Sequence, residues 1–288
     1  MPRFGAHMSI SGGLHKAVER GQTIGCQTIQ VFTRNQARWK SKQRTAEELA
    51  LYRRTLENTD IHPVVAHAIY LINLASPDDT VRAKSNAAFV EELARCRQAG
   101  IPYLVIHPGS HKNTGLEQGI ARIAEGINRA YETHPEYAPT EAGGVITLLE
   151  NTAGQGATIG RSFQELAQIA EQIDNPKCVG YCFDTAHGLA SGYELRTAEG
   201  YESLWQRFDQ LLGLDKLYCM HLNDSKYDLG AGRDRHQHIG EGFVGLAAFR
   251  MLVNDRRFAN LPMLLETPKG ADMQEDVKNL ALLRSLLA

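Results

Sequence analysis

Eight short apolar segments alternate with longer amphipathic stretches along this chain of 288 residues. The apolar segments are rich in β-branched and aromatic residues, which is typical of buried strands, and the stretches between them have helical spacing. In the predicted helix at residues 78–98, Leu93 lies four residues after Phe89, and Gly100 follows its end. The predicted strands are residues 4–8, 28–33, 63–68, 103–107, 144–150, 179–184, 217–222 and 262–266. This alternation predicts an α/β protein with a parallel sheet.

The number of strand-helix units favours a closed barrel over an open sheet. An open doubly wound sheet would be expected to carry a GxGxxG turn after its first strand, and the segment from Ser9 to Gly13 does not match it. An eight-fold barrel typically has about 250 residues, and we find no linker or low-complexity segment in the sequence. We therefore expect a single (β/α)8 TIM-barrel domain over residues 1–288, with its active site at the C-terminal ends of the strands.

Composition indicates an ordinary globular protein, with 43% hydrophobic and 22% charged residues. The five cysteines are odd in number and include no CxxC pair, which argues against a disulfide framework and favours a reducing cytoplasm. The first residues lack a signal-peptide pattern, and no apolar run is long enough to cross a membrane. A formal net charge of −2 argues weakly against a nucleic-acid partner, but that count omits any bound metal ions.

Nine residues that can bind a metal stand mostly at or just after the predicted strands. They are His67, His107, Glu150, Asp184, His187, His221, Asp234, His236 and Glu266. Strand ends of a barrel open onto one face, so distant ligands can converge there. Imidazole and carboxylate ligands suit zinc, and also manganese or iron. Because three or four protein ligands complete one catalytic zinc site, nine residues suggest two or three metals with some bridging carboxylates.

Each of these residues also has an ordinary structural interpretation. A lone histidine at a strand end is commonly a hydrogen-bonded structural residue, and Asp184 could cap a following helix. Glu150 and Glu266 are harder to explain in this way, because each closes an apolar segment (VITLLE and PMLLE) where an unpaired carboxylate would be costly. Taken jointly, the nine residues favour a metal site. His7, which also ends a strand, is expected to be a supporting pocket residue.

A basic segment follows the second predicted strand, at residues 33–44 (TRNQARWKSKQR). It could be a solvated loop. A loop after a strand nevertheless lies on the active face of a barrel, and basic side chains beside Trp39 suit contacts to phosphates and bases.

Three sequence blocks carry a family resemblance. They are HAIYLINLA from His67, GYCFDTAHGLA from Gly180, and MHLNDSK followed by DRH between Met220 and His236. Together with the nine candidate ligands they closely resemble endonuclease IV, the zinc-dependent family of apurinic/apyrimidinic endonucleases. The resemblance extends over essentially the whole chain, from GAHMSISGGL to LLETP.

The resemblance implies three zinc ions per subunit and a role for each ligand. His67, His107 and Glu150 would bind one zinc; Glu150 would bridge to a second shared with Asp184, His221 and Glu266; His187, Asp234 and His236 would hold the third. It implies Glu150 as the catalytic residue and Gln36, Arg38 and Tyr70 as DNA-binding residues. The partner would be double-stranded DNA containing abasic sites, and we expect a monomer.

Two positions depart from the family pattern. Ala186 stands where members commonly have Cys, and Ala37 follows Gln36 where Arg is frequent. The first is not a ligand position, whereas the second lies in the loop that the resemblance implies would contact DNA. Two alternatives to a nuclease stay open: a metal-dependent sugar isomerase on a similar barrel, and a non-catalytic binder of damaged DNA.

Overall fold

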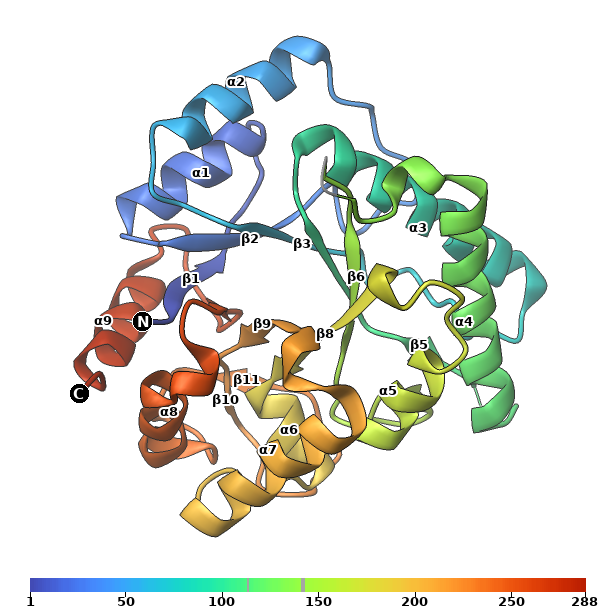
Figure 1. Cartoon of the computed structure of the whole chain (residues 1–288). Coiled ribbons are helices and arrows are strands. Elements are labelled where there is room, and N and C mark those ends of the chain that lie inside the picture. Colours follow the sequence, from blue (N-terminus) through green and yellow to red (C-terminus); the bar gives the residue numbers. More distant parts are fainter. Residues whose placement is uncertain (113, 141–142) are drawn as a thin grey trace.

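The computed structural model describes residues 1–112, 114–140 and 143–288. Its centre is a closed barrel of parallel strands in which the order follows the chain and the last strand returns to the first (Figure 1). The strands are β1 Arg3–His7, β2 Thr28–Phe32, β3 Val64–His67, β4 Tyr103–Ile106, β6 Ile146–Glu150, β8 Val179–Asp184, β9 Leu217–His221 and β12 Pro262–Leu265. The predicted (β/α)8 architecture is therefore confirmed.

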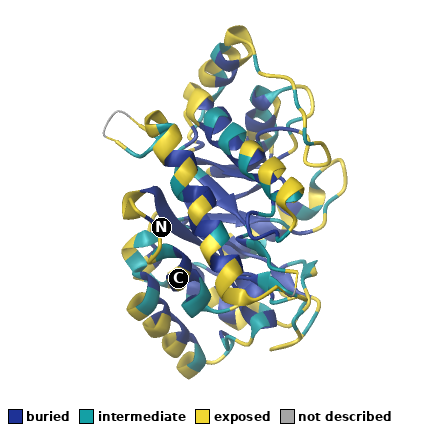
Figure 2. Ribbon diagram, turned by 90° about the vertical axis from the view of Figure 1, so that its right-hand side faces the viewer, coloured by how far each residue is buried: buried dark blue, intermediate teal, exposed yellow. Residues whose placement is uncertain are grey.

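Helices surround the barrel and bury their inner faces against it (Figure 2). They are α1 Leu14–Thr23, α2 Ala46–Glu57, α3 Asp79–Ala99, α4 Leu116–Thr133, α5 Phe163–Ala170, α6 Thr185–Ser191, α7 Ala198–Leu212, α8 Gly245–Asn254 and α9 Gln274–Ser285. Helix α3 shows why the sequence was sufficient to predict where a helix begins and ends. The Asp78 carboxylate accepts the Val81 N–H, and Gly100 ends the helix in the left-handed conformation that glycine adopts without strain.

The interior of the barrel is filled by a layer of small and medium-sized apolar side chains. The layer contains Val65, Val105, Leu148, Cys182, Cys219 and Leu264, all at most 1% exposed. Because residues two apart on a strand point to the same side, this layer brings the next inward-facing residues, such as Glu150 after Leu148, to the C-terminal mouth. Full burial of such a side chain contributes about 1.5–3 kcal/mol. The layer is therefore a firm apolar base beneath the mouth.

The structure adds short elements that the sequence did not predict. Strand β5 (Gly109–Ser110) pairs with β7 (Thr158–Ile159), and β10 (Asp224–Ser225) pairs with β11 (His236–Gln237). Both two-stranded sheets lie in loops that follow barrel strands, on the side of the predicted site. Within the described residues, no helix is long and apolar enough to span a membrane.

Candidate metal centre

All nine predicted ligands come from segments at one end of the barrel. His67, Glu150, Asp184 and His221 are the last residues of β3, β6, β8 and β9, and His107 and Glu266 directly follow β4 and β12. His187 lies in the short helix α6, while Asp234 and His236 belong to the excursion that ends in β11. The strand ends therefore supply six of the nine, and the loops beyond them supply the rest.

The imidazole and carboxylate atoms form three overlapping groups with potential ligand atoms within 4.8 Å of one another. The groups are His67, His107 and Glu150; then Glu150, Asp184, His221 and Glu266; then Asp184, His187 and His236. Asp234 is at the edge of the third group, with its Oδ1 3.2 Å from His187 Nε2 and 3.5 Å from His236 Nε2. A further group joins His221 to Cys182 and Cys219 in the apolar layer below.

Glu150 connects the groups because its two carboxylate oxygens face different histidines. Oε2 lies 3.2 Å from His67 Nε2 and 3.1 Å from His107 Nε2. Oε1 lies 2.9 Å from His221 Nδ1 and 3.3 Å from His187 Nδ1. The side chain is fully buried, so this carboxylate has the placement expected of a bridging ligand.

Four of the histidines each direct one ring nitrogen to a backbone carbonyl or side-chain amide oxygen. His67 Nδ1 donates to Ala68 O over 2.7 Å, and His187 Nδ1 to Asn151 O over 3.0 Å. His236 Nδ1 donates to Glu266 O over 3.2 Å, and His221 Nε2 donates to Gln30 Oε1 over 2.8 Å. A backbone carbonyl can only accept, so the nitrogen that contacts it carries the proton. Such contacts fix the tautomer and are typical of metal-ligating histidines.

When such a ring is neutral, as a metal ligand must be, its other nitrogen presents a lone pair to carboxylate oxygens. For His67, Nε2 faces Glu150 Oε2 at 3.2 Å, and two facing acceptors repel each other unless a proton or a cation lies between them. The Nε2 atoms of His187 and His236 are buried without a hydrogen-bond partner. The donor set and its orientation therefore fit divalent metal ions.

Asp184 serves both the fold and the cluster. Its Oδ1 accepts the His187 N–H over 2.8 Å and so caps α6, which is the structural role that the sequence also allowed for Asp184. Its Oδ2 accepts from Asn223 Nδ2 over 2.6 Å and lies 3.6 Å from His236 Nε2. One oxygen thus starts the helix that carries His187, while the other remains in the cluster.

Mutual attraction between buried rings and carboxylates displaces their pKa values. Burial alone would raise the pKa of Glu150, but His221 and His107 outweigh it and hold that pKa well below its ordinary value. Burial would lower the pKa of His221, yet Glu266 and Glu150 raise it well above the ordinary value. His7 differs, because burial lowers its pKa to about 3 and leaves a neutral ring 3.1 Å from Gln30 Nε2. It is the supporting residue expected from the sequence.

A cavity of about 550 Å³ opens above the cluster. Its lining includes His107, His187, Asp234, His236 and Glu266. Tyr70, 59% exposed, stands at this mouth with its ring centroid 5.4 Å from that of His67 and 5.6 Å from that of His107. Lys226 and Arg235 also line the cavity, and both are exposed. They place positive charge beside the cluster.

The basic loop after β2 is divided between exposed and buried residues. Gln36 and Arg38 are exposed, but they are not among the lining residues of the cavity. Arg34, expected with the other basic residues to contact phosphate, is instead buried. Arg44 is also turned inward and donates to Thr33 O over 2.9 Å. The solvent-facing positive charge of this loop is therefore carried by Arg38, Lys40 and Lys42.

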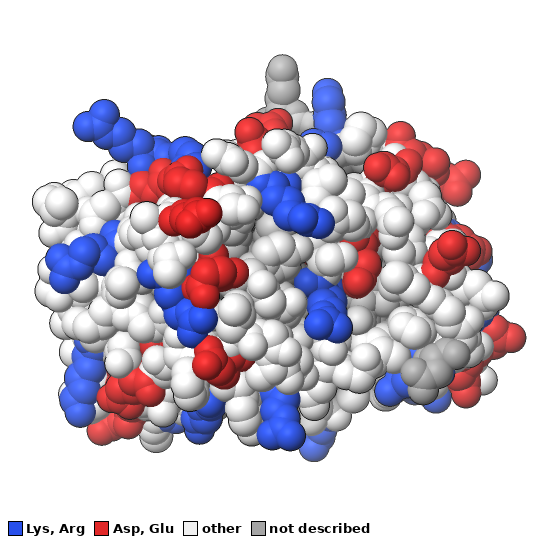
Figure 3. Space-filling model, turned by 90° about the horizontal axis from the view of Figure 1, so that it is seen from below, with Lys and Arg blue, Asp and Glu red and all other residues white. Residues whose placement is uncertain are grey.

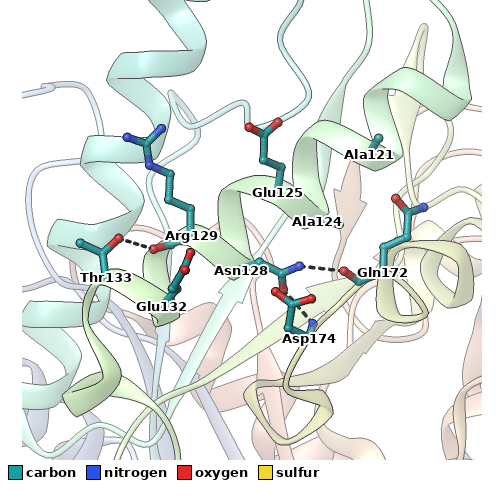
Figure 4. Close-up of a pocket in the computed structure, with 9 residues that line it drawn as sticks. All are labelled: Ala121, Ala124, Glu125, Asn128, Arg129, Glu132, Thr133, Gln172 and Asp174. Atoms are coloured by element: carbon teal, nitrogen blue, oxygen red, sulfur yellow. Dashed lines mark hydrogen bonds between the residues drawn. The ribbon is translucent and has the colours of Figure 1, made fainter.

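A larger hollow of about 790 Å³ lies on the outside of the barrel, against α4 (Figure 4). Its wall includes Gln172 and Asp174, which precede β8, so it lies toward the end of the barrel opposite the strand ends. Asn128 uses its polar groups on this wall, donating to Gln172 O over 2.8 Å and accepting from Asp174 N over 3.1 Å. None of the predicted ligands lines it.

Several residues of the site were not predicted from the sequence. Gln30, Asn151 and Asn223 orient ligands, and Lys226 and Arg235 line the cavity. Asn223 and Lys226 lie inside the block MHLNDSK, and Arg235 lies between two ligands, so proximity to recognised motifs was an available signal. Gln30 offered a different one, a buried amide inside the apolar strand TIQVF.

Comparison with known proteins agrees with this geometry. The model of the family described as xylose isomerase-like TIM barrel matches residues 18–286. A protein of Chloroflexus aurantiacus named probable endonuclease 4 is 52% identical over 287 residues, covering 100% of this chain and 99% of that protein. The chain belongs to the endonuclease IV family.

Other members of the endonuclease IV family give the same result. A probable endonuclease 4 of Geobacter sulfurreducens is 50% identical over 99% of this chain and 94% of its own length. The crystal structure of endonuclease IV from Thermus thermophilus superposes with a TM-score of 0.86 at 31% identity, covering 99% of this chain and 98% of that one. The family resemblance found in the sequence is thus confirmed.

Proposed function

We propose that this protein hydrolyses the phosphodiester bond on the 5′ side of abasic sites in duplex DNA, as an enzyme of base excision repair. The products would be a 3′-hydroxyl and a 5′-deoxyribose phosphate. The observation that carries the proposal is the convergence of three potential ligand groups through Glu150 and Asp184 beneath an open cavity. The relatedness to proteins named endonuclease 4 supports it.

Three zinc ions are the proposed cofactors, each held by one group of residues. His67, His107 and Glu150 would hold the first, Glu150 with Asp184, His221 and Glu266 the second, and His187, Asp234 and His236 the third. When bound, such ions neutralise phosphate charge, lower the pKa of water and stabilise a departing oxygen. Imidazole and carboxylate donors without exposed thiols are consistent with zinc in these positions.

The protein's own groups have separate parts in the proposed reaction. Glu150 is the proposed catalytic residue, because its carboxylate can accept a proton from the attacking water at the point where two groups meet. Lys226 and Arg235 would bind backbone phosphates at the cavity wall. Asn223 orients Asp184 with its Nδ2 and donates no group to the cavity lining.

Recognition would depend on the reduced cost of moving an abasic nucleotide out of the helix. A nucleotide without a base has lost its stacking and pairing, so it is cheaper to extrude. Tyr70 at the mouth, with Gln36 and Arg38 on the loop after β2, would contact the DNA around the lesion. The face seen in Figure 3 carries Lys and Arg interspersed with Asp and Glu, so the described residues of that face offer no extended basic surface to DNA. We therefore place the phosphate contacts at the cavity, which Lys226 and Arg235 line.

One duplex assay tests this proposal. Purified protein is incubated with a duplex that contains a single tetrahydrofuran abasic analogue, and with the same duplex without it. We expect a single nick 5′ to the analogue, with a 3′-hydroxyl that a polymerase extends. Glu150→Gln, which keeps the side-chain shape, should bring the rate near background. Absence of a metal-dependent nick at the analogue would rule the proposal out.

The matching family model is described as xylose isomerase-like, so sugar isomerisation is the second candidate. Metal analysis separates the two: about three firmly held zinc ions favour the nuclease, and one or two exchangeable magnesium or manganese ions favour the isomerase. A non-catalytic binder of damaged DNA would retain the abasic duplex without turnover. We propose that the active form is a monomer, which sedimentation at the assay concentration tests.

A further inference from the structure

The loop after β2, residues 33–45, is fastened from beneath by buried charged side chains. Arg34 is the second residue of the loop, and its side chain turns inward and is 0% exposed. Its Nε donates to Glu92 Oε1 over 2.7 Å, and the Glu92 side chain is also 0% exposed. The other Glu92 oxygen accepts from the Thr33 hydroxyl. Glu92 of α3 thus binds the first two residues of the loop, Thr33 by a hydrogen bond and Arg34 by a buried ion pair.

The rest of the Arg34 guanidinium connects the loop to itself and to α3. Nη1 donates to Trp39 O over 3.0 Å and to Glu91 Oε2 over 2.8 Å, and Nη2 donates to Ala88 O over 3.2 Å. The contact with Trp39 O closes residues 34–39 into one turn. Only a planar guanidinium with several donors can make these contacts together.

Three further interactions hold the loop on either side of its tip. Arg95 of α3 donates from Nη1 to Lys42 O and from Nη2 to Ser41 O, each over 3.1 Å. At the tip, Asn35 Oδ1 accepts the Ala37 N–H over 2.9 Å. At the end, Thr45 and Glu48 form a capping box that starts α2. These contacts leave Gln36, Ala37 and Arg38 exposed on a fastened base.

Such a buried pair is poorly explained by global stability alone. Removing two charges from water costs free energy that can exceed their mutual attraction, and apolar side chains of similar size often stabilise a fold equally well. A buried pair instead fixes geometry. A loop that is already in its binding conformation loses less conformational entropy when it meets its partner.

We propose that Arg34 and Glu92 are positioning residues that preform the loop of residues 33–45 for contact with DNA. This inference rests on the proposed function, since it assumes that the exposed tip of this loop meets the DNA duplex. Neither side chain touches the DNA. They hold the loop through their contacts with Trp39 O and Thr33. Their loss should therefore weaken DNA binding and leave the metal cluster unchanged.

The test compares two isosteric variants of neighbouring glutamates. Glu92→Gln keeps the shape and removes the buried charge, whereas Glu91→Gln alters a side chain that is 45% exposed and contacts the same guanidinium. We expect Glu92→Gln to raise KM for the abasic duplex about tenfold, with kcat and zinc content unchanged. Glu91→Gln should stay within about twofold of the unaltered protein, as surface ion pairs contribute little.

A second measurement needs no DNA. Trypsin can cut after Arg38, Lys40 and Lys42, and a loosened loop exposes those bonds more often. We expect faster cleavage at these three sites in Glu92→Gln, with unchanged circular dichroism, and little change in Glu91→Gln. If Glu92→Gln does not fold, Arg34→Lys replaces it, because lysine keeps the charge but cannot make the four contacts.

The outcomes separate this inference from the proposed function. If the unaltered protein does not nick the abasic duplex, the proposed function fails, while trypsin still reports on loop order. If Glu92→Gln changes neither KM nor loop cleavage, the positioning role is overturned. An equal loss in kcat and zinc content would also overturn it, because the pair would then be supporting the whole barrel.

Discussion

Gln30 Nε2 donates to Glu266 Oε1 over 2.6 Å across the mouth of the barrel. The same amide uses its oxygen to accept from His221 Nε2 over 2.8 Å. A single side chain of β2 therefore orients one carboxylate and selects the tautomer of one imidazole. This leaves His221 Nδ1 directed at the oxygens of Glu150 and Glu266.

Gln30→Ala should weaken metal binding without unfolding the barrel. Partners that orient metal ligands typically contribute 10- to 100-fold to metal affinity, so we expect a loss of about that size for the most weakly held ion. Competition with a chromophoric chelator measures it. Gln168→Ala, an exposed position on α5, is the matched control. Equal affinity in the two variants would contradict the role assigned to Gln30.

Metal removal should lower both activity and stability. Ions that bind only the folded chain stabilise it by mass action, by about 2.7 kcal/mol when their concentration is 100 times Kd. Dialysis against a strong chelator should therefore lower Tm by several degrees and stop nicking, and added zinc should restore both. A Tm that does not respond to chelation would show that the cluster holds no stabilising metal.

Tyr70 is expected to act through its ring rather than its hydroxyl. The ring centroid lies 5.6 Å from that of Phe32 and 5.4 Å from that of His67, at the mouth of the cavity. Tyr70→Phe should keep nearly full activity on the abasic duplex. Tyr70→Ala should reduce kcat/KM by about 10- to 100-fold, since stacking on an aromatic ring contributes roughly 1–3 kcal/mol. Equal losses in both variants would instead assign the role to the hydroxyl.

Asp255 should contribute stability that depends on pH. Burial would raise its pKa, but hydrogen bonds from Arg257 and from the Tyr201 hydroxyl outweigh this and hold that pKa below its ordinary value. A carboxylate whose pKa is lowered in the folded protein stabilises the fold at pH values above its unfolded pKa of about 3.9. This stabilisation is lost as the pH falls through the folded pKa. Asp255→Asn should therefore lower the free energy of unfolding by about 1–3 kcal/mol at pH 7.

The difference between Asp255→Asn and the unaltered protein should shrink below about pH 4. Urea denaturation of metal-free protein at both pH values measures it without a contribution from metal release. Asp228→Asn, at an exposed pair with Arg196, should have little effect at either pH. A difference that grows as the pH falls would have the wrong sign for this pair.

The barrel could be predicted from the sequence because its strands are continuous apolar runs with polar residues at their ends. The predicted strand 4–8 corresponds to β1 Arg3–His7, and the predicted helix 78–98 corresponds to α3 Asp79–Ala99. The start of the helix differs by one residue because Asp78 is its N-cap, whose side chain binds the helix although the residue does not belong to it. Local pattern was sufficient for these elements.

Other features depend on contacts between distant residues. Arg34 reads as one of several solvated loop cations, and its partners Glu91 and Glu92 lie 57 and 58 positions further along the chain. In the sequence, Gln30 is only a polar residue within an apolar strand. Its role depends on contact with Glu266, which lies 236 positions further along the chain. The sequence could predict which residues were available as ligands, but it could not predict which side chains would orient them.

Closure of the barrel joins its first and last strands, because β12 pairs with both β1 and β9. Glu266 follows β12 directly, so a chain still being made by the ribosome lacks this residue until all eight barrel strands have been synthesised. The second ligand group can thus be completed only after β12 docks between β1 and β9. A metal ion held there would link β12 to the other strands that supply its ligands, and its release would be an early sign that the first and last strands have separated.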